Sequence, residues 1–275
     1  MLDRAEWLRQ RRDYLGASEV PAVCGLDPFH SPLQIWALKR GLAQDRQSAA
    51  GDMGNLFEGP LLAYYAQRHA RTLTKPGTLR RIDFPWMAAT PDAVTLCDRN
   101  VQAKMVGSRM VYRWDDGCPD YVQAQTQWEM WVTGLKVSDV PACLGGTDYQ
   151  EYEVKRDDTA IGYLVEICSR FWRDNVIGGI MPDIDGTEET RRILAARFPS
   201  ITAGMQEADP DFIVMAERYK EISRAISAVE EEKDMLANSI RLAIGEKAGL
   251  KWANGHATWK PDAKGVRRLH VHIKE

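Results

Sequence analysis

Apolar residues recur at the spacing of amphipathic helices along much of the first two hundred residues. The pattern predicts the end of a short helix at 6–12, helices after Ser18 and after Ser31, and longer helices at 54–69, 121–133 and 159–176. Ser18 is a candidate N-cap with Pro21 in the first turn behind it, and Gly25 stands where that helix should end.

Extended segments lie between these helices. They are predicted at 79–84, 87–96, 101–106 and 149–154, with a turn at 97–100. Helices, then a run of strands, then helix and strand again indicate an α/β (α+β) domain in which helices flank a mixed central sheet.

The C-terminal part of the chain has a different pattern. Apolar side chains alternate at three- and four-residue spacing over 212–243, with Lys233 as the polar exception, which predicts a long helix with a heptad seam. This helix either lies on the domain or forms an arm for self-association or for a partner. Residues 250–259 are typical of a β-hairpin closed by a type I′ turn at Asn254-Gly255. We therefore divide the chain into residues 1–200 and residues 201–275.

Two histidines, His270 and His272, stand on one face of a final predicted strand. Histidines at this spacing can ligate a metal ion, but no third ligand is near them in the sequence. A surface strand and a metal site are the two interpretations.

Composition gives no support to nucleic-acid binding. The formal net charge is −3 and the pI is about 6.0, so a bulk basic footprint is absent. Contact with DNA must then come from local clusters of arginine. The candidates are Arg9, Arg11 and Arg12; Arg80 and Arg81; and Arg267 and Arg268.

Cysteine usage and hydropathy describe the expected compartment. The five cysteines are widely spaced and form no CxxC pair, which argues against a disulfide framework, a zinc ribbon or an iron–sulfur cluster. The first residues hold no apolar signal segment, and no apolar run approaches the length of a membrane span. We therefore expect a soluble, cytoplasmic protein.

The chemically informative segment joins Asp92 to the predicted strand that holds Gln102, Ala103 and Lys104. On a strand, Gln102 and Lys104 project to one face and Ala103 to the other. An aspartate beside an acid-x-lysine strand is the minimal set for metal-dependent phosphodiester hydrolysis. Carboxylates and the backbone carbonyl of Ala103 would hold Mg²⁺, and Lys104 would orient or deprotonate the attacking water.

Further motifs stand in order along residues 5–190. They are Arg11-Arg12 with Leu15-Gly16-Ala17-Ser18-Glu19; Gly25-Leu26-Asp27-Pro28-Phe29 with Ser31-Pro32-Leu33; Gly54-Asn55-Leu56-Phe57-Glu58; Thr90-Pro91-Asp92; Gln102-Ala103-Lys104; Gln125-Thr126-Gln127 with Met130-Trp131-Val132-Thr133; and Phe171-Trp172 ahead of Pro182-Asp183. Together they resemble the YqaJ-type viral recombinase family, which includes lambda-type exonuclease, in the PD-(D/E)xK nuclease superfamily. The resemblance implies a restriction-endonuclease-like core, and the heptad helix and hairpin also look like the tail of phage members.

The resemblance implies roles for individual residues. Glu58 and Asp92 match the metal-binding acids, and Lys104 matches the catalytic lysine, although a glutamate such as Glu58 is also common on a helix surface. Arg11 and Ser18 match residues that bind the 5′-phosphate, although Ser18 is equally explained as a helix cap. DNA contact is implied for Gln125, and we add Arg109 and Arg113, which lie just beyond the catalytic strand.

The resemblance also implies an activity. It is that of a Mg²⁺-dependent 5′→3′ exonuclease, with two metal ions that Mn²⁺ can replace. The enzyme would act on linear double-stranded DNA with a 5′-phosphate end and leave a 3′ single strand for a single-strand annealing protein. A homo-oligomer, specifically a trimer, and a phage or prophage origin are implied in the same way.

Position 102 departs from the family, which has glutamate there. Glutamine keeps the shape and one oxygen but lacks the negative charge on which a Mg²⁺ site depends. We interpret Gln102 as an engineered substitution of the kind used to trap uncut substrate, with a naturally inactive paralogue as the alternative. A DNA-end-binding module that does not cleave, and a structure-specific or restriction-like endonuclease, are the competing functions.

Overall fold

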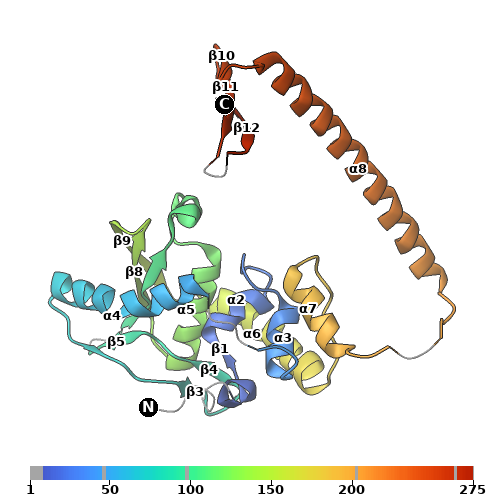
Figure 1. Ribbon diagram of the computed structural model, residues 1–275. Coiled ribbons are helices and arrows are strands. Elements are labelled where there is room, and N and C mark those ends of the chain that lie inside the picture. Colours follow the sequence, from blue (N-terminus) through green and yellow to red (C-terminus); the bar gives the residue numbers. More distant parts are fainter. Residues whose placement is uncertain (1–8, 45–47, 97–98, 202–203, 263–264, 275) are drawn as a thin grey trace. The chain divides into compact units, whose positions relative to one another are not determined.

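The chain folds into two compact units, Met1–Ile201 and Thr202–Glu275. The computed structural model describes residues 9–44, 48–96, 99–201, 204–262 and 265–274 (Figure 1). Each unit is considered by itself below.

The first unit is built on a six-stranded mixed sheet. Its strands, in the order β2-β5-β6-β8-β7 with β9 paired to β8, are β2 (Leu73–Thr74), β5 (Ala93–Thr95), β6 (Arg99–Val101), β8 (Val137–Leu144), β7 (Lys104–Val106) and β9 (Asp148–Lys155). β6 and β7 both pair parallel with β8, whereas β9 pairs with it antiparallel. A smaller sheet has the order β1 (Leu15–Gly16), β4 (Met87–Ala89) and β3 (Leu79–Arg80).

Helices cover these sheets, which confirms the predicted mixed α/β architecture (Figure 1). They are α2 (Val20–Val23), α3 (Pro32–Lys39), α4 (Ala49–His69), α5 (Asp120–Thr133), α6 (Asp158–Arg170) and α7 (Glu188–Arg197), with 3₁₀ turns η1 (Arg11–Asp13), η2 (Ala17–Glu19) and η3 (Ser108–Trp114). α6 continues as a π-helical segment, η4 (Phe171–Ile177). The main core includes Trp128 of α5 and Trp36 of α3, both without exposed surface.

Several helix predictions need correction. The N-cap assigned to Ser18 is wrong, because Ser18 lies inside the turn η2 and the following helix α2 begins at Val20. The helix predicted after Ser31 is confirmed, and the Ser31 hydroxyl caps it by accepting the N–H of Gln34. α4 begins at Ala49 rather than at residue 54, capped by Ser48. Residues 1–8, which include part of the first expected helix, lie outside the described residues.

The strand predictions were incomplete at the centre of the sheet. β8 was not predicted, because Asp139 and Pro141 are residues that central strands normally exclude. The extended segment predicted at 87–96 is interrupted between β4 and β5, where Asp92 lies. The strand predicted at 101–106 is also interrupted, at Gln102 and Ala103.

The second unit consists of one long helix and a three-stranded sheet. The helix α8 (Pro210–Ile244) confirms the predicted continuous helix, and its sheet has the order β10 (Gly249–Trp252), β11 (Gly255–Pro261) and β12 (Arg267–Ile273). Ile244 at the end of α8 and Ala257 of β11 are both buried where the helix meets the sheet.

The hairpin turn differs from the prediction. Trp252 pairs with Gly255, so the two-residue loop is Ala253-Asn254, and neither residue has a positive φ. A type I′ turn at Asn254-Gly255 is therefore wrong. Gly255 has another role, because a Cβ there would collide with the carbonyl oxygen of His272 and would lie 2.7 Å from the ring of Trp252.

The two histidines of the final strand do not share one partner. His272 pairs with His256 across the hairpin, with ring centroids 5.3 Å apart, whereas His270 pairs with Thr258. Among the described residues, no group of three or more histidine, cysteine or acidic side chains could hold a metal ion. The same residues include no helix with the length and hydropathy needed to cross a bilayer.

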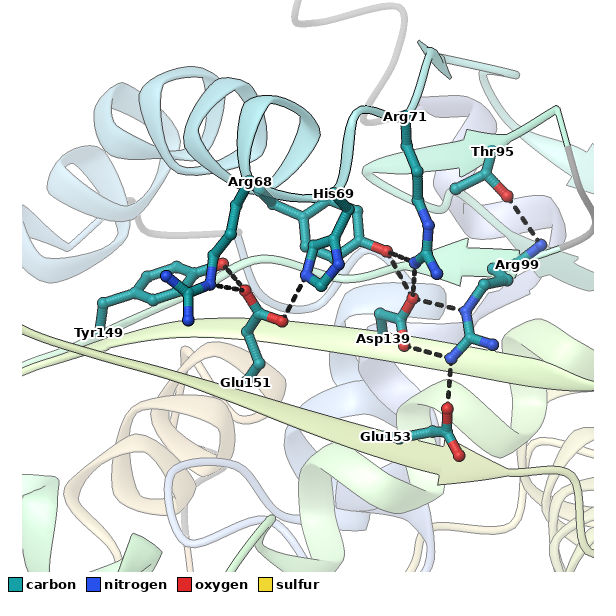
Figure 2. Close-up of polar contacts among 10 residues, drawn as sticks. Arg68, His69, Arg71, Thr95, Arg99, Asp139, Tyr149, Glu151 and Glu153 are labelled. Carbon is teal, nitrogen blue, oxygen red and sulfur yellow. Dashed lines mark hydrogen bonds and ion pairs between the residues drawn. The ribbon is translucent and has the colours of Figure 1, made fainter.

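Asp139 of β8 joins its strand to the helix α4, to the segment after α4 and to the strand β6 (Figure 2). Its carboxylate accepts hydrogen bonds from Tyr65 of α4 (2.5 Å), from Arg71 just after α4 (2.8 Å) and from two nitrogens of Arg99 on β6 (2.6 Å each). Its backbone oxygen accepts the N–H of Gln102 at 2.9 Å. Although burial opposes the charge, the hydrogen bonds from Arg99 and Tyr65 hold the pKa of Asp139 below its ordinary value.

A second cluster fastens the end of the same helix to β9 (Figure 2). Glu151 accepts hydrogen bonds from Tyr149 and His69 at 2.6 Å each and pairs with Arg68 at 3.4 Å. The two clusters together fix α4 against the sheet.

Replacing Asp139 tests this connection. We expect Asp139→Asn to lower the free energy of unfolding by about 2–4 kcal/mol at pH 7, because two arginines and a tyrosine lose a shared charged partner. Urea denaturation measures this value. Glu153→Gln is the matched control, because Glu153 is an exposed partner of Arg99 and should change stability by less than about 1 kcal/mol. Equal effects of the two substitutions would contradict the prediction.

Candidate active site

The interruptions in the two strands bring the predicted centre together. Asp92 lies in the gap between β4 and β5, and its Oδ2 accepts the backbone N–H of Ala103 at 2.9 Å and the side-chain amide of Gln102 at 2.7 Å. Because Gln102 and Ala103 lie outside the strand ladder between β6 and β7, the N–H of Ala103 is free to turn toward Asp92.

The Asp92 carboxylate is held in a poorly neutralised position. Burial raises its pKa, the charge of Lys104 opposes that rise, and the nearby negative charge of Glu58 adds to it, so that the pKa of Asp92 is raised to about 6. Glu58, on α4, therefore lies within electrostatic reach of Asp92. Its own partner is Lys75, at 2.6 Å.

The side-chain amide of Gln102 has a hydrogen-bonded nitrogen and an unsatisfied oxygen. The side chain is buried, its Nε2 donates to Asp92, and its Oε1 has no hydrogen-bond partner among the described residues. An unsatisfied buried oxygen costs about 1–3 kcal/mol. The oxygen stands beside a carboxylate with a raised pKa, and hard oxygen atoms of this kind are the ligands that Mg²⁺ and Mn²⁺ prefer. These donors fit a divalent cation, although position 102 contributes no charge.

A chain of hydrogen bonds leads from Lys104 into the core. Lys104 Nζ donates to Gln125 Oε1 at 2.7 Å, and Gln125 Nε2 donates to Glu129 Oε1 at 2.9 Å. Glu129 Oε2 accepts Asn100 Nδ2 at 2.6 Å, and the same nitrogen donates to Ser138. Gln125 thus lies at the site, as predicted, and it links the lysine to a buried acid.

Glu129 and Asn100 also belong to the site, and neither was predicted from the sequence. Glu129 has no exposed surface, and burial together with the charge of Asp92 raises its pKa to about 7. The one signal in the sequence was an acid one helical turn after Gln125, between the apolar residues Trp128 and Met130. An acid at such a position is normally exposed.

A cleft of about 570 Å³ opens beside Lys104 and Gln125. Arginines from the first described turn line its other side together with Ser18; they are Arg9, Arg11 and Arg12. The structure therefore brings the predicted phosphate-binding residues Arg11 and Ser18 into one cleft with Lys104 and Gln125. By contrast, Arg109 and Arg113 of η3 are exposed and are not among the described residues that line it.

Buried charges hold Arg11 at the cleft. Its guanidinium lies 2.9 Å from Glu19 and 3.4 Å from the Ser18 hydroxyl, and Lys39 contacts the other oxygen of Glu19 at 2.6 Å. Burial opposes the charge of Glu19, but Lys39 and Arg11 outweigh it and lower the pKa of Glu19. Glu19 and Lys39 were not predicted as site residues, and they position Arg11.

The other arginine clusters are engaged in packing. Arg81 lies 4.0 Å from the ring centroid of Trp131, and Arg80 lies 4.6 Å from that of Tyr14. In the second unit, Arg267 lies 3.7 Å from the ring centroid of Trp259. These contacts account for the three arginines without a nucleic acid.

The raised pKa of Asp92 predicts a pH-dependent stability. In the unfolded chain Asp92 ionises near its ordinary value of 3.8, whereas in the fold it keeps its proton until about pH 6, so the fold loses stability as pH rises through this window. We expect Asp92→Asn to raise the free energy of unfolding by up to about 3 kcal/mol at pH 8 in chelator, and by little at pH 4. Urea denaturation at the two pH values measures the difference. An equal effect at both would contradict it, and the exposed Asp83→Asn is the control.

The chain is similar to known proteins in sequence and in fold. Residues 6–136 match the model of the YqaJ-like viral recombinase domain. The chain is also similar to the uncharacterised protein YqaJ of Bacillus subtilis (strain 168), with 24% identity over 275 aligned positions, which cover 94% of this chain and 84% of that protein.

Two solved structures share the fold. An alkaline exonuclease from Laribacter hongkongensis superimposes with a TM-score of 0.53 at 20% identity, over 62% of this chain and 91% of that one. A putative exonuclease from Eubacterium rectale gives a TM-score of 0.52 at 12% identity, over 78% of this chain and 98% of that one. At these identities the likeness concerns the fold alone. Over residues 6–136 the chain is therefore similar to YqaJ-like viral recombinase domains.

Proposed function

We propose that the chain is a metal-dependent DNA exonuclease that acts on the ends of linear duplexes, and that Gln102 weakens its cleavage. The observation that carries the proposal is the convergence of Lys104, Gln125, Arg11 and Ser18 on one cleft, next to the buried carboxylate of Asp92. The recombinase domain family and the fold shared with proteins described as exonucleases support it.

The oxygen atoms beside Asp92 fit a divalent cation such as Mg²⁺ or Mn²⁺. Asp92, Glu58 and the side chain of residue 102 would hold it, with the carbonyl of Ala103. When bound, the ion would lower the pKa of a water and offset charge on the reacting phosphate. A second ion, as the family resemblance implies, would depend on a carboxylate at position 102, which this chain lacks.

The chain's own residues supply the remaining functions. The Lys104 side chain, held by Gln125, lies at the cleft. As an ammonium it can orient a water, and as a free amine it can accept the proton of that water. Arg11, held by Glu19, would bind the terminal phosphate through a bidentate contact. A terminal 5′-phosphate bound at this place would give 5′→3′ polarity.

The biological setting belongs to the same proposal. We propose that the substrate is linear double-stranded DNA with a 5′-phosphate, and that the product is a 3′ single strand for an annealing protein. We further propose a homo-oligomer in which α8 takes part, and a cytoplasmic location. The description of the matched family as viral supports a phage or prophage origin.

Restoring the acid is the direct test of the enzyme. We expect Gln102→Glu to raise the Mg²⁺-dependent release of nucleotides from linear duplex DNA by about 100-fold or more, because the site regains a charged oxygen ligand. The rate is measured on linear and on circular DNA of the same sequence. Gln102→Glu combined with Asp92→Asn is the inactive control. No release from linear DNA would contradict the proposal, and rapid cutting of closed circles would identify an endonuclease instead.

The phosphate-binding role of Arg11 predicts a specific loss. We expect Arg11→Lys to reduce the preference for 5′-phosphorylated over 5′-hydroxyl duplex ends about 10-fold, because lysine keeps the charge but loses the planar fork. Fluorescence anisotropy in chelator measures both affinities. Arg109→Ala is the matched control, since Arg109 lies outside the cleft lining. A parent protein that binds both ends equally would contradict this role.

A DNA-end-binding module that does not cleave is the second candidate. It is favoured by the hydrogen bond from Gln102 to Asp92, since the amide occupies an oxygen that a metal ion would use. End binding that survives chelation, together with no gain of cleavage in Gln102→Glu, is the result expected for this alternative.

A further inference from the structure

Glu129 is the most completely buried acid among the described residues, and it lies directly behind the candidate site. Its side chain has no exposed surface and belongs to α5, the helix at the centre of the unit. A buried carboxylate is unfavourable unless hydrogen bonds and neighbouring charges compensate it. Its persistence in the core therefore calls for a function that an apolar residue could not supply.

Both oxygens of Glu129 accept amide hydrogen bonds. Gln125 donates to Oε1 at 2.9 Å and Asn100 donates to Oε2 at 2.6 Å. An ionised carboxylate is a pure acceptor, so two amide donors match its charged form. The two contacts join Glu129 to the helix and to the strand that carry the site.

The hydrogen bond to Glu129 fixes the orientation of the Gln125 amide. Because the Gln125 nitrogen points to Glu129, its oxygen points to Lys104, whose ammonium lies 2.7 Å away. The reversed amide would place its NH₂ group against the ammonium of Lys104. Glu129 thus holds the lysine through Gln125, without touching it.

Glu129 is also linked to the neighbourhood of position 102, where the chain has a neutral glutamine in place of an acid. Asn100, which contacts Glu129, precedes Gln102 by two residues on the same stretch of chain. Gln102 itself lies just beyond the end of β6, where its Nε2 donates to Asp92. A carboxylate at position 102 would add its charge to that of Asp92, the partner of Gln102, and the charge of Asp92 already acts on Glu129.

We propose that Glu129 is a positioning residue that carries, one layer behind the site, the negative charge that Gln102 lacks, and that it holds the Lys104 ammonium through Gln125. On this view positions 102 and 129 together carry one negative charge. The neutral glutamine at position 102 is then compensated by the glutamate at position 129. The role of Lys104 in catalysis rests on the proposed function, whereas the relation between the charges at positions 102 and 129 does not.

A double-mutant cycle tests the shared charge. The full chain is compared with Gln102→Glu, Glu129→Gln and the double variant by thermal unfolding in chelator at pH 8.5, where acids of the site are ionised. We expect Gln102→Glu to lower the unfolding midpoint by roughly 5 °C when Glu129 is present, because two buried like charges repel. In the Glu129→Gln background the same change at position 102 should lower the midpoint by less than half as much.

The outcomes separate a shared charge from simple packing. An equal fall in both backgrounds, or no fall in either, would overturn the proposal. A Gln102→Glu protein that folds only together with Glu129→Gln would be the extreme form of the expected result. Glu166→Gln, a change on the helix α6 outside the hydrogen-bonded chain of the site, is the control and should show no coupling to position 102.

The cycle contains neither DNA nor metal, so its result is independent of whether the chain cleaves DNA. If the double-mutant cycle shows no coupling but the Gln102→Glu protein cleaves DNA with Mg²⁺, only the role of Glu129 is rejected. If the cycle shows the expected coupling but the Gln102→Glu protein does not cleave DNA, only the proposed exonuclease activity is rejected.

Discussion

The buried carboxylate of Asp92 is the constraint on which the candidate site depends. It lies in a gap between two strands, and two donors from a second gap, Gln102 and Ala103, satisfy it. The raised pKa shows that these donors and Lys104 do not fully compensate for burial and for the charge of Glu58. A buried carboxylate whose negative charge is only partly neutralised is suited to bind a cation. Without a cation, the same charge lowers the stability of the fold.

Buried charged residues around Asp92 hold the side chains of the candidate site in position. Asp139 fixes the helix that carries Glu58 against the strand that precedes Gln102, Glu19 and Lys39 hold Arg11 at the cleft, and Glu129 lies behind Lys104. Each of these acids is buried and accepts several hydrogen bonds, which is the condition under which a buried charge is tolerated. The side chains of the candidate site therefore depend on buried acids that hold them in place.

Local patterns in the sequence predicted the α/β class, the helix α5, the strand β9 and the long helix α8, because each follows a clear hydrophobic period. The motif residues Asp92, Lys104, Gln125, Arg11 and Ser18 were found from their order along the chain. The strand β8 was missed because Asp139 and Pro141 break the pattern, although pairing on both sides sustains it. Glu129 and Glu19 were missed because their burial depends on distant partners. Asn254-Gly255 misled for a similar reason, since the packing of Trp252 and His272 against Gly255 sets the register.

We propose that Asp92 and residue 102 together form a divalent-cation site. Crystals of the Gln102→Glu protein soaked in Mn²⁺ and measured for anomalous scattering test it most directly. The account predicts an anomalous peak in contact with Asp92 and with the introduced carboxylate at position 102, and a weaker peak or none with Gln102. A Gln102→Glu crystal with no peak at Asp92, or with Mn²⁺ only at the His256–His272 pair, would contradict it.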